Sequence, residues 1–259
     1  MSQIQISSSQ LLKLLGVKKT FGGLVAVNNL SFEVGEGEIV GLIGPNGAGK
    51  TTVFNTIAGM YRPDSGAIYF GGSSIIGKKP HDISRLGIAR TFQTVRPFSR
   101  MTVIENAMMG SLFGRDHTLS VPIARERAYK ILVFTELDKK AETLAGNLTL
   151  AEQRRLELAR ALAAQPRLLM LDEVMAGLNL TEISDTLDLL FRLNKEMKLA
   201  ILVIEHVMKA VMKLCSRIVV IDHGAVIAEG TPQEVVANEN VIIAYMGNKN
   251  AEKTQQETD

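Results

Sequence analysis

The chain has 259 residues, a formal net charge of +2, and 46% hydrophobic residues. This length suits one large or two small domains, and the apolar content is enough for a core without disulfides or structural metals. The nearly balanced charge gives no reason to expect a nucleic-acid partner.

The single cysteine, Cys215, cannot form an internal disulfide, which fits a reducing compartment. No apolar run approaches the ~20 residues that span a bilayer. The first ten residues lack the basic and then apolar order of a secretory signal. We therefore expect a soluble, cytoplasmic protein.

The N-terminal part is predicted to be β-structure that leads into a glycine-rich turn. Apolar residues predict strands over residues 11–17 and 30–34, with a loop at Gly22 and Gly23 between them. A third strand, residues 38–43, ends at the segment GPNGAGKTT, and a helix is expected over residues 51–60. A strand, a glycine-rich turn and a helix in this order form a cradle for phosphate groups.

The segment GPNGAGKTT fits the P-loop pattern, in which a glycine and four residues precede Gly-Lys-Thr. Its glycines let the backbone approach the phosphates closely, and backbone N–H groups face the anion. The lysine adds a positive charge at the β- and γ-phosphates, and the first threonine offers a hydroxyl to Mg²⁺. The alternative is a glycine-rich turn with a surface lysine. The candidate nucleotide-binding residues are Gly44, Pro45, Asn46, Gly47, Ala48, Gly49, Lys50, Thr51 and Thr52.

The middle of the chain changes from strand to helix patterns. A turn at residues 63–66 precedes a strand over 67–70, and a helix over 80–86 precedes a strand over 88–92 that ends at Gln93. Helical spacing then dominates to about residue 165, which predicts a helical subdomain over about 95–165. Thr149 and Glu152 form a capping-box pattern ahead of a helix over 153–164. This pattern either caps the helix only or also presents an anion site at the helix N-terminus.

Strand and helix alternate again after residue 166. The apolar strand 168–171 ends in Asp172 and Glu173, where Asp172 would support Mg²⁺ and Glu173 would polarise a water molecule. The alternative is a strand that ends in a solvated acidic pair. The strand 200–204 precedes His206, which would reach a γ-phosphate or simply enter a helix.

The C-terminal third completes an α/β pattern. A helix is predicted over residues 181–194, strands over 218–221 and 225–228, and helices over 232–237 and 241–246. We expect one nucleotide-binding domain over residues 1–247 and a polar, disordered tail over residues 248–259. The fold class is α/β, a nucleotide-binding core interrupted by a helical subdomain.

Taken in order, these motifs resemble those of ABC transporter ATP-binding subunits over about residues 11–247. GPNGAGKTT matches the Walker A motif and LLMLDE, residues 168–173, matches Walker B. Gln93 falls at the Q-loop, residues 176–179 at the D-loop and His206 at the switch histidine. The resemblance implies a P-loop NTPase core with a mixed sheet, an antiparallel β subdomain and an inserted helical subdomain.

The resemblance also implies the roles of the candidate residues and their ligands, ATP and Mg²⁺. Glu173, His206 and Gln93 would be catalytic, and the metal would be held by Thr51, Gln93 and Asp172. Phe21 resembles the aromatic residue that stacks on adenine, although an aromatic at a strand end can also be part of the core. The signature segment at 148–152, through Thr149, Ala151 and Glu152, would contact the nucleotide bound by an opposite subunit.

Two further segments, residues 87–106 and 230–247, resemble the ATPases of branched-chain or hydrophobic amino-acid uptake, the LivG-like group. The family implies a second ATPase subunit, identical or related, together with transmembrane permeases and, indirectly, a solute-binding protein. It places such a subunit on the cytoplasmic face of the inner or plasma membrane, with no nucleic-acid partner. Alternatives are a related lipid or lipopolysaccharide exporter, a urea or amide importer, a non-transport ABC ATPase, or a regulatory module with little turnover.

The chain departs from the family pattern at three places. The signature LSGGQ is replaced by LTLAE, so Ala151 stands where the family has a glycine. Val174 replaces the proline after Walker B, and Asn179 replaces the D-loop aspartate. We therefore expect the chain to bind ATP, whereas the altered signature segment weakens the expectation of fast turnover.

Overall fold

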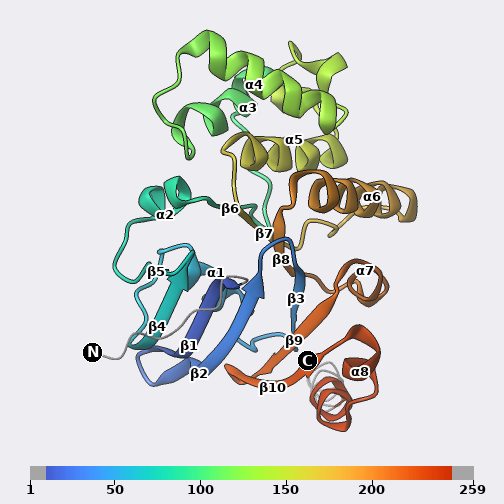
Figure 1. Ribbon diagram of the computed structural model, residues 1–259. Coiled ribbons are helices and arrows are strands. Elements are labelled where there is room, and N and C mark those ends of the chain that lie inside the picture. The colour runs from blue at the N-terminus through green and yellow to red at the C-terminus, as the bar shows by residue number, and fades with distance from the viewer. Residues whose placement is uncertain (1–9, 247–259) are drawn as a thin grey trace. The chain divides into compact units, whose positions relative to one another are not determined.

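The computed structural model describes residues 10–246, which form two compact units (Figure 1). The first contains residues 10–77 and 203–246, and the second contains residues 78–202. The chain thus leaves the first unit once and returns to it. The predicted polar tail, residues 248–259, lies outside the described residues. No helix of the described part is long and apolar enough to cross a bilayer.

The first unit contains a four-stranded antiparallel sheet of β1 (Gln10–Phe21), β2 (Leu24–Gly35), β4 (Ser65–Phe70) and β5 (Ser73–Ser74), in the order β2-β1-β4-β5. β1 and β2 form a hairpin around Gly22 and Gly23, and Gly22 has a φ of 56°, which suits glycine. Both strands extend beyond the predicted ranges. The prediction followed apolar residues, whereas the strands continue through polar residues that are exposed on one face.

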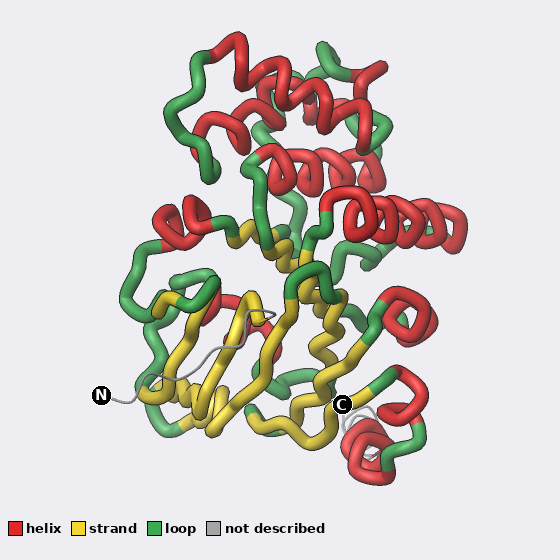
Figure 2. Tube along the Cα trace, viewed as in Figure 1, coloured by secondary structure: helices red, strands yellow, loops and turns green. Residues whose placement is uncertain are grey.

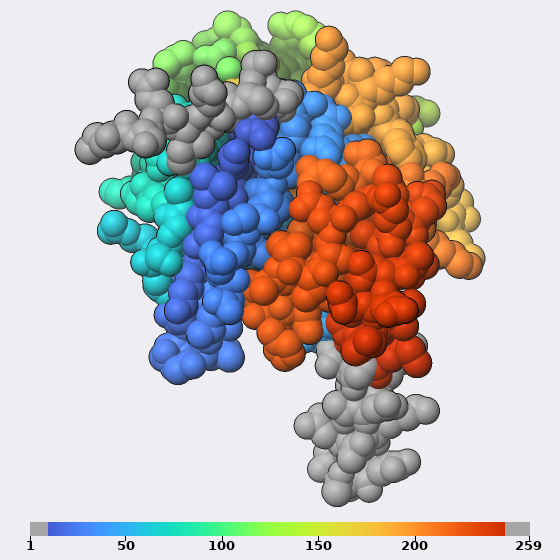
Figure 3. All heavy atoms as spheres, turned by 60° about the horizontal axis from the view of Figure 1, so that its bottom comes forward, coloured from blue at the N-terminus to red at the C-terminus, as the bar shows by residue number. Residues whose placement is uncertain are grey.

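The first unit also contains β3 (Ile39–Ile43), β9 (Arg217–Asp222) and β10 (Ala225–Gly230). β3 is parallel to β9, and β10 is antiparallel to β9, so the arrangement is mixed. All of β3 is buried, as expected for a strand covered on both faces. The helices include α1 (Lys50–Ile57), α7 (Met208–Leu214) and α8 (Pro232–Val236), and residues 239–246 are also helical. β10 contacts β2, and Figure 3 shows the blue N-terminal strands beside the orange C-terminal ones.

The second unit contains β6 (Ile88–Arg90), β7 (Leu168–Asp172) and most of β8 (Ala200–Ile204). β6 and β7 are parallel, and every residue of β7 and β8 is buried. Helices α2 (Pro80–Leu86) and α6 (Leu180–Met197) belong to the same unit. The predicted strand over residues 168–171 and the predicted helix over residues 80–86 are confirmed.

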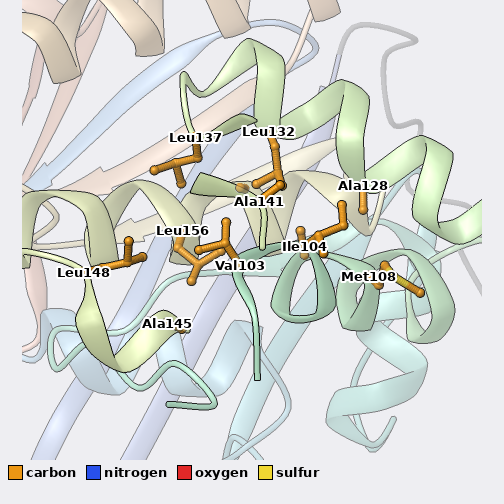
Figure 4. Close-up of a cluster of buried hydrophobic side chains, with 12 residues drawn as sticks. Val103, Ile104, Met108, Ala128, Leu132, Leu137, Ala141, Ala145, Leu148 and Leu156 are labelled. Carbon is orange, nitrogen blue, oxygen red and sulfur yellow. The ribbon is translucent and has the colours of Figure 1, made fainter. Parts of the chain in front are cut away.

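Three helices form the predicted helical part of the second unit, and they appear among the red segments of Figure 2. They are α3 (Val103–Phe113), α4 (Val121–Phe134) and α5 (Leu150–Ala163), with short 3-10 helices η1 (Asp138–Lys140) and η2 (Ala145–Asn147) between α4 and α5. Side chains from all three helices, including Ile104, Leu132 and Leu156, pack into one buried cluster (Figure 4). This cluster gives the helices a core of their own.

Candidate functional site

The P-loop segment, residues 44–52, connects β3 to α1 in the first unit. Gly44, Gly47 and Gly49 have φ angles of 155°, 78° and 101°, which favour glycine. A Cβ at Gly44 would lie 2.0 Å from the Ile221 carbonyl oxygen, and one at Gly49 would lie 2.2 Å from the Ala26 carbonyl oxygen. Two of the three glycines are therefore required by close backbone packing as well as by their dihedral angles.

Lys50 is buried at the start of α1 and lies against the loop that precedes it. Its Nζ donates to the carbonyl oxygens of Gly44 at 2.7 Å and Pro45 at 2.8 Å. The loop therefore curls around a positive charge at the N-terminus of a helix, where backbone N–H groups favour an anion. Thr51, in the first turn of α1, is exposed. This arrangement can bind the phosphates of a nucleotide.

The turn between β9 and β10 braces the P-loop. The Gly224 N–H donates to the Ala48 carbonyl oxygen at 3.0 Å, and the Gly224 carbonyl oxygen accepts from the Asn28 N–H at 2.8 Å. Gly224 has a φ of 78°, and a Cβ there would lie 2.8 Å from the Ala26 carbonyl oxygen and from the Val27 Cα. The sequence predicts strands over residues 218–221 and 225–228 on either side of this segment, but nothing local indicates that the segment contacts residue 48.

Phe21 lies at the end of β1 and is 42% exposed, so the alternative of a core aromatic is wrong. Its ring packs edge-on against Tyr61, with centroids 5.1 Å apart and planes at 74°. Lys19 Nζ lies 5.4 Å from the ring centroid. An exposed ring between an aromatic and a cation can stack on a planar base. His206 is also exposed, and it follows β8 before α7 begins.

Asp172 and Glu173 stand at the end of β7 in the second unit. Asp172 is 3% exposed, and its Oδ2 accepts from Arg90 Nη2 at 2.6 Å, a contact that compensates the buried carboxylate. Glu173 has a φ of 53°. A non-glycine residue in the left-handed region costs about 1–3 kcal/mol and is typical of functional sites. Sequence reasoning missed Arg90, which the preceding strand β6 carries opposite β7.

Gln93 contacts Glu173 within the same unit. Gln93 Nε2 donates to Glu173 Oε2 at 2.8 Å, although the two residues are 80 positions apart in the sequence. Thr91, two residues before Gln93, makes two hydrogen bonds to β7. Its N–H donates to the Met170 carbonyl oxygen at 2.9 Å, and its Oγ1 accepts from the Asp172 N–H at 3.3 Å. The structure therefore brings together two of the predicted catalytic residues.

The segment 148–152 forms the predicted cap of α5. The Glu152 N–H donates to Thr149 Oγ1 at 3.3 Å, and the Thr149 N–H donates to Glu152 Oε2 at 3.0 Å. Lys140 also pairs with Glu152, and together with Thr149 it holds the pKa of that carboxyl below its usual range. Ala151 follows the half-exposed Leu150 in the first turn.

The segment that departs from the D-loop pattern has a clear local role. Asn179 caps α6: its Oδ1 accepts from the Glu182 N–H at 3.0 Å, and Glu182 Oε2 accepts from the Asn179 N–H at 2.9 Å. Asparagine and aspartate cap helices about equally well, so this departure costs the fold nothing. Gly177 has a φ of 80°, and a Cβ there would lie 3.3 Å from Leu150 Cδ2.

The predicted metal ligands are chemically suited to Mg²⁺. Thr51, Gln93 and Asp172 offer a hydroxyl, an amide oxygen and a carboxylate, which are the hard oxygen donors that Mg²⁺ prefers. Mg²⁺ normally keeps several waters and shares its remaining positions with phosphate oxygens. Residues 10–246 contain no cluster of three or more His, Cys, Asp or Glu side chains that could hold a metal ion.

Comparison with known proteins places these features in context. Residues 27–176 match the family model described as ABC transporter, and residues 225–249 match one described as branched-chain amino acid ATP-binding cassette transporter. The high-affinity branched-chain amino acid transport ATP-binding protein BraF of Pseudomonas aeruginosa is 43% identical over 252 residues, which cover 93% of this chain and 99% of BraF. The corresponding LivG of Escherichia coli gives the same identity and coverage.

Solved structures of ATP-binding cassettes have the same fold as this chain. An ATP-binding cassette of an ABC transporter in its ADP conformation has a TM-score of 0.83 at 30% identity, covering 92% of this chain and 99% of that one. A dimeric ATP-binding cassette bound to ADP and Pi, in a post-hydrolysis state, has a TM-score of 0.77 at 26% identity, covering 86% of this chain and 99% of that one.

Proposed function

This chain is an ATPase of the ABC transporter family, and from that premise we propose that it is the ATP-hydrolysing subunit of an importer for branched-chain or other hydrophobic amino acids. The observation that carries the cargo proposal is the 43% identity to BraF and LivG over 93% of the chain. The match of residues 225–249 extends the likeness beyond the nucleotide-binding motifs, which all ABC ATPases share.

The P-loop of this chain binds the phosphates of ATP. Lys50 exchanges its contacts with the loop carbonyl oxygens for the β- and γ-phosphates, because phosphate oxygens carry more negative charge. Backbone N–H groups of residues 47–52 orient the phosphates. Phe21 stacks on the adenine, and its contact with Tyr61 holds the ring in place.

Glu173 orients the attacking water, and Gln93 holds the Glu173 carboxylate through the 2.8 Å hydrogen bond. His206 donates to the γ-phosphate. Thr51, Gln93 and Asp172 would hold Mg²⁺, which would neutralise phosphate charge. Arg90 pairs with Asp172 and holds that carboxylate in place.

Other subunits complete the transporter. Two ATPase subunits, identical or related, pair so that the segment 148–152 of one faces the ATP held by the P-loop of the other. Transmembrane permease subunits carry the solute, and a solute-binding protein acts through them. The chain works as a peripheral subunit on the cytoplasmic face of the inner or plasma membrane.

The substitution Glu173→Gln tests the proposed catalytic role. Glutamine preserves the size of the side chain but cannot accept a proton, so ATP binding persists and hydrolysis falls by about 10²–10⁴-fold. Phosphate release and nucleotide affinity are measured on the full chain, with Glu126→Gln as a control because Glu126 is exposed on α4. Phosphate release by Glu173→Gln at the wild-type rate would remove Glu173 from the mechanism.

The cargo is tested in proteoliposomes that contain the permease subunits that co-purify with this chain. ATP hydrolysis should rise when leucine, isoleucine or valine is offered with its binding protein, and not with urea or a lipid. Stimulation by urea or lipid alone would instead assign the chain to one of the related systems. Ala151 in the signature favours a second candidate, a regulatory module, which predicts nucleotide binding without turnover even with the permeases present.

A further inference from the structure

One face of α5 holds the loop that connects β6 to α3. Arg154, Glu157 and Arg160 are spaced three residues apart, so their side chains leave the helix on the same side. Arg154 Nη1 donates to the Phe92 carbonyl oxygen at 3.2 Å, and Glu157 Oε1 accepts from the Phe92 N–H at 3.1 Å. Arg160 Nη1 donates to the Arg96 carbonyl oxygen at 3.3 Å.

Glu157 is the central member of this face and it is buried, with 4% of its surface exposed. Its second oxygen, Oε2, has no hydrogen-bond partner among the described residues. Burial raises the pKa of this carboxyl, against the opposing effects of the Phe92 N–H and of the charges on Arg160 and Arg154. A buried polar group with an unpaired atom is costly, so an apolar residue would fill this position at less cost. The bond to Phe92 is the contact that an apolar residue cannot make.

Phe92 lies between Thr91 and Gln93, which contact the acidic pair Asp172 and Glu173 at the end of β7. Thr91 Oγ1 accepts from the Asp172 N–H, and Gln93 Nε2 donates to Glu173 Oε2. Both main-chain polar groups of Phe92 are held by α5. A shift of α5 therefore pulls on Phe92 and, through it, on the Gln93 side chain that touches Glu173.

We propose that Glu157 is a positioning residue that couples α5, whose N-terminus carries the segment 148–152, to the Gln93–Glu173 contact. The inference deepens the proposed function and rests on it for the role of Glu173. By fixing the Phe92 amide, Glu157 holds Gln93 where it can orient the catalytic carboxylate. The P-loop lies outside this linkage, so Glu157 acts on turnover and not on nucleotide affinity.

Three substitutions separate the hydrogen bond from charge and packing. Glu157→Gln keeps an acceptor oxygen at the same reach and removes the charge. Glu157→Asp keeps the charge and withdraws the acceptor by one methylene group. Glu157→Met keeps the length and removes the acceptor. Glu126→Met, on the exposed face of α4, is the matched control for the last of these.

The first measurement is hydrogen–deuterium exchange at the Phe92 amide in the nucleotide-free full chain. Loss of a hydrogen bond to a charged group corresponds to about a tenfold or greater increase in exchange. We expect this increase in Glu157→Met and Glu157→Asp, and wild-type exchange in Glu157→Gln and Glu126→Met. Wild-type exchange in Glu157→Asp, or in a folded Glu157→Met, would overturn the proposal. If Glu157→Met fails to fold, Glu157→Asp decides.

The second measurement is steady-state ATP hydrolysis. We expect kcat to fall about tenfold in the Asp and Met variants with KM unchanged, and both constants to be preserved in the Gln variant. An equal loss of kcat in all three variants, or a change in KM alone, would refute positioning through the Phe92 amide. Because the exchange measurement needs no turnover, it tests the Glu157 contact even if Glu173→Gln shows that Glu173 has no catalytic role.

Discussion

Gly224 provides a sharp test of how the P-loop is supported, because it lies outside every motif. The substitution Gly224→Ala places a methyl group at a φ of 78°, 2.8 Å from both the Ala26 carbonyl oxygen and the Val27 Cα. The left-handed conformation alone costs a non-glycine residue about 1–2 kcal/mol. The steric contact is shorter than Cβ atoms tolerate, so the turn must move away from both atoms. Such movement breaks the bond from the Gly224 N–H to Ala48.

Gly77 is a matched control for this substitution. It has a φ of 79°, and a Cβ there would meet no atom within 4 Å. Gly77→Ala therefore carries the conformational cost alone, about 1–2 kcal/mol of unfolding free energy. Gly224→Ala adds overpacking, typically about 1–3 kcal/mol, for a total of about 2–5 kcal/mol.

The assay combines urea unfolding with ATP affinity measured on the folded proteins. We expect Gly77→Ala to retain wild-type ATP affinity and Gly224→Ala to bind ATP about tenfold more weakly, a change equivalent to about 1.4 kcal/mol. Equal unfolding free energies for the two variants, together with unchanged affinity in both, would show that the turn does not support the loop.

Three further predictions concern other residues. Phe21→Ala should raise the Kd for ATP while Phe21→Tyr keeps it near the wild-type value, and an isothermal titration in which both variants behave alike would argue against stacking. Hydrogen bonds from Thr20 and Lys19 lower the pKa of Asp64 to about 2. Because the folded-state pKa is depressed, the stabilisation is present above about pH 4 and is lost as the pH falls to about 2. The melting temperature of the wild type should therefore fall more steeply over this interval than that of Asp64→Asn, and parallel curves would contradict this. Ala151→Gly should leave ATPase activity equal or higher at a small cost in helix stability, and a large loss of activity would show that the alanine suits its surroundings.

The order of strands and helices could be predicted from the sequence because the apolar runs are short and well separated. β7, β8 and α2 appear within a residue of their predicted ranges, and the ABC-cassette fold is confirmed by the matching solved structures. The hairpin β1–β2 is longer than predicted because its polar residues pair on an exposed face. Helix α7 was given no range, although one interpretation of His206 placed it at the entry to a helix.

The candidate site was predictable where its chemistry lies in one contiguous segment. The P-loop and the acidic pair at the end of β7 are of this kind. Arg90, Gly224 and Glu157 were not identified, because each acts through a contact with residues 65 or more positions away. Such partners become visible only when the chain is folded. The contact of Gln93 with Glu173 spans 80 residues, and only the resemblance to a family indicated that both belong to the site.

The close approach of Leu150 to Gly177 has a consequence for the sequences of relatives. A Cβ at position 177 would lie 3.3 Å from Leu150 Cδ2. A long side chain at position 150 and any side chain at position 177 would therefore occupy the same space. Proteins of this family should therefore vary at these two positions in a correlated way. Where position 150 carries a small residue, as in the family pattern LSGGQ, position 177 becomes free of this steric restriction, although its φ of 80° still favours glycine.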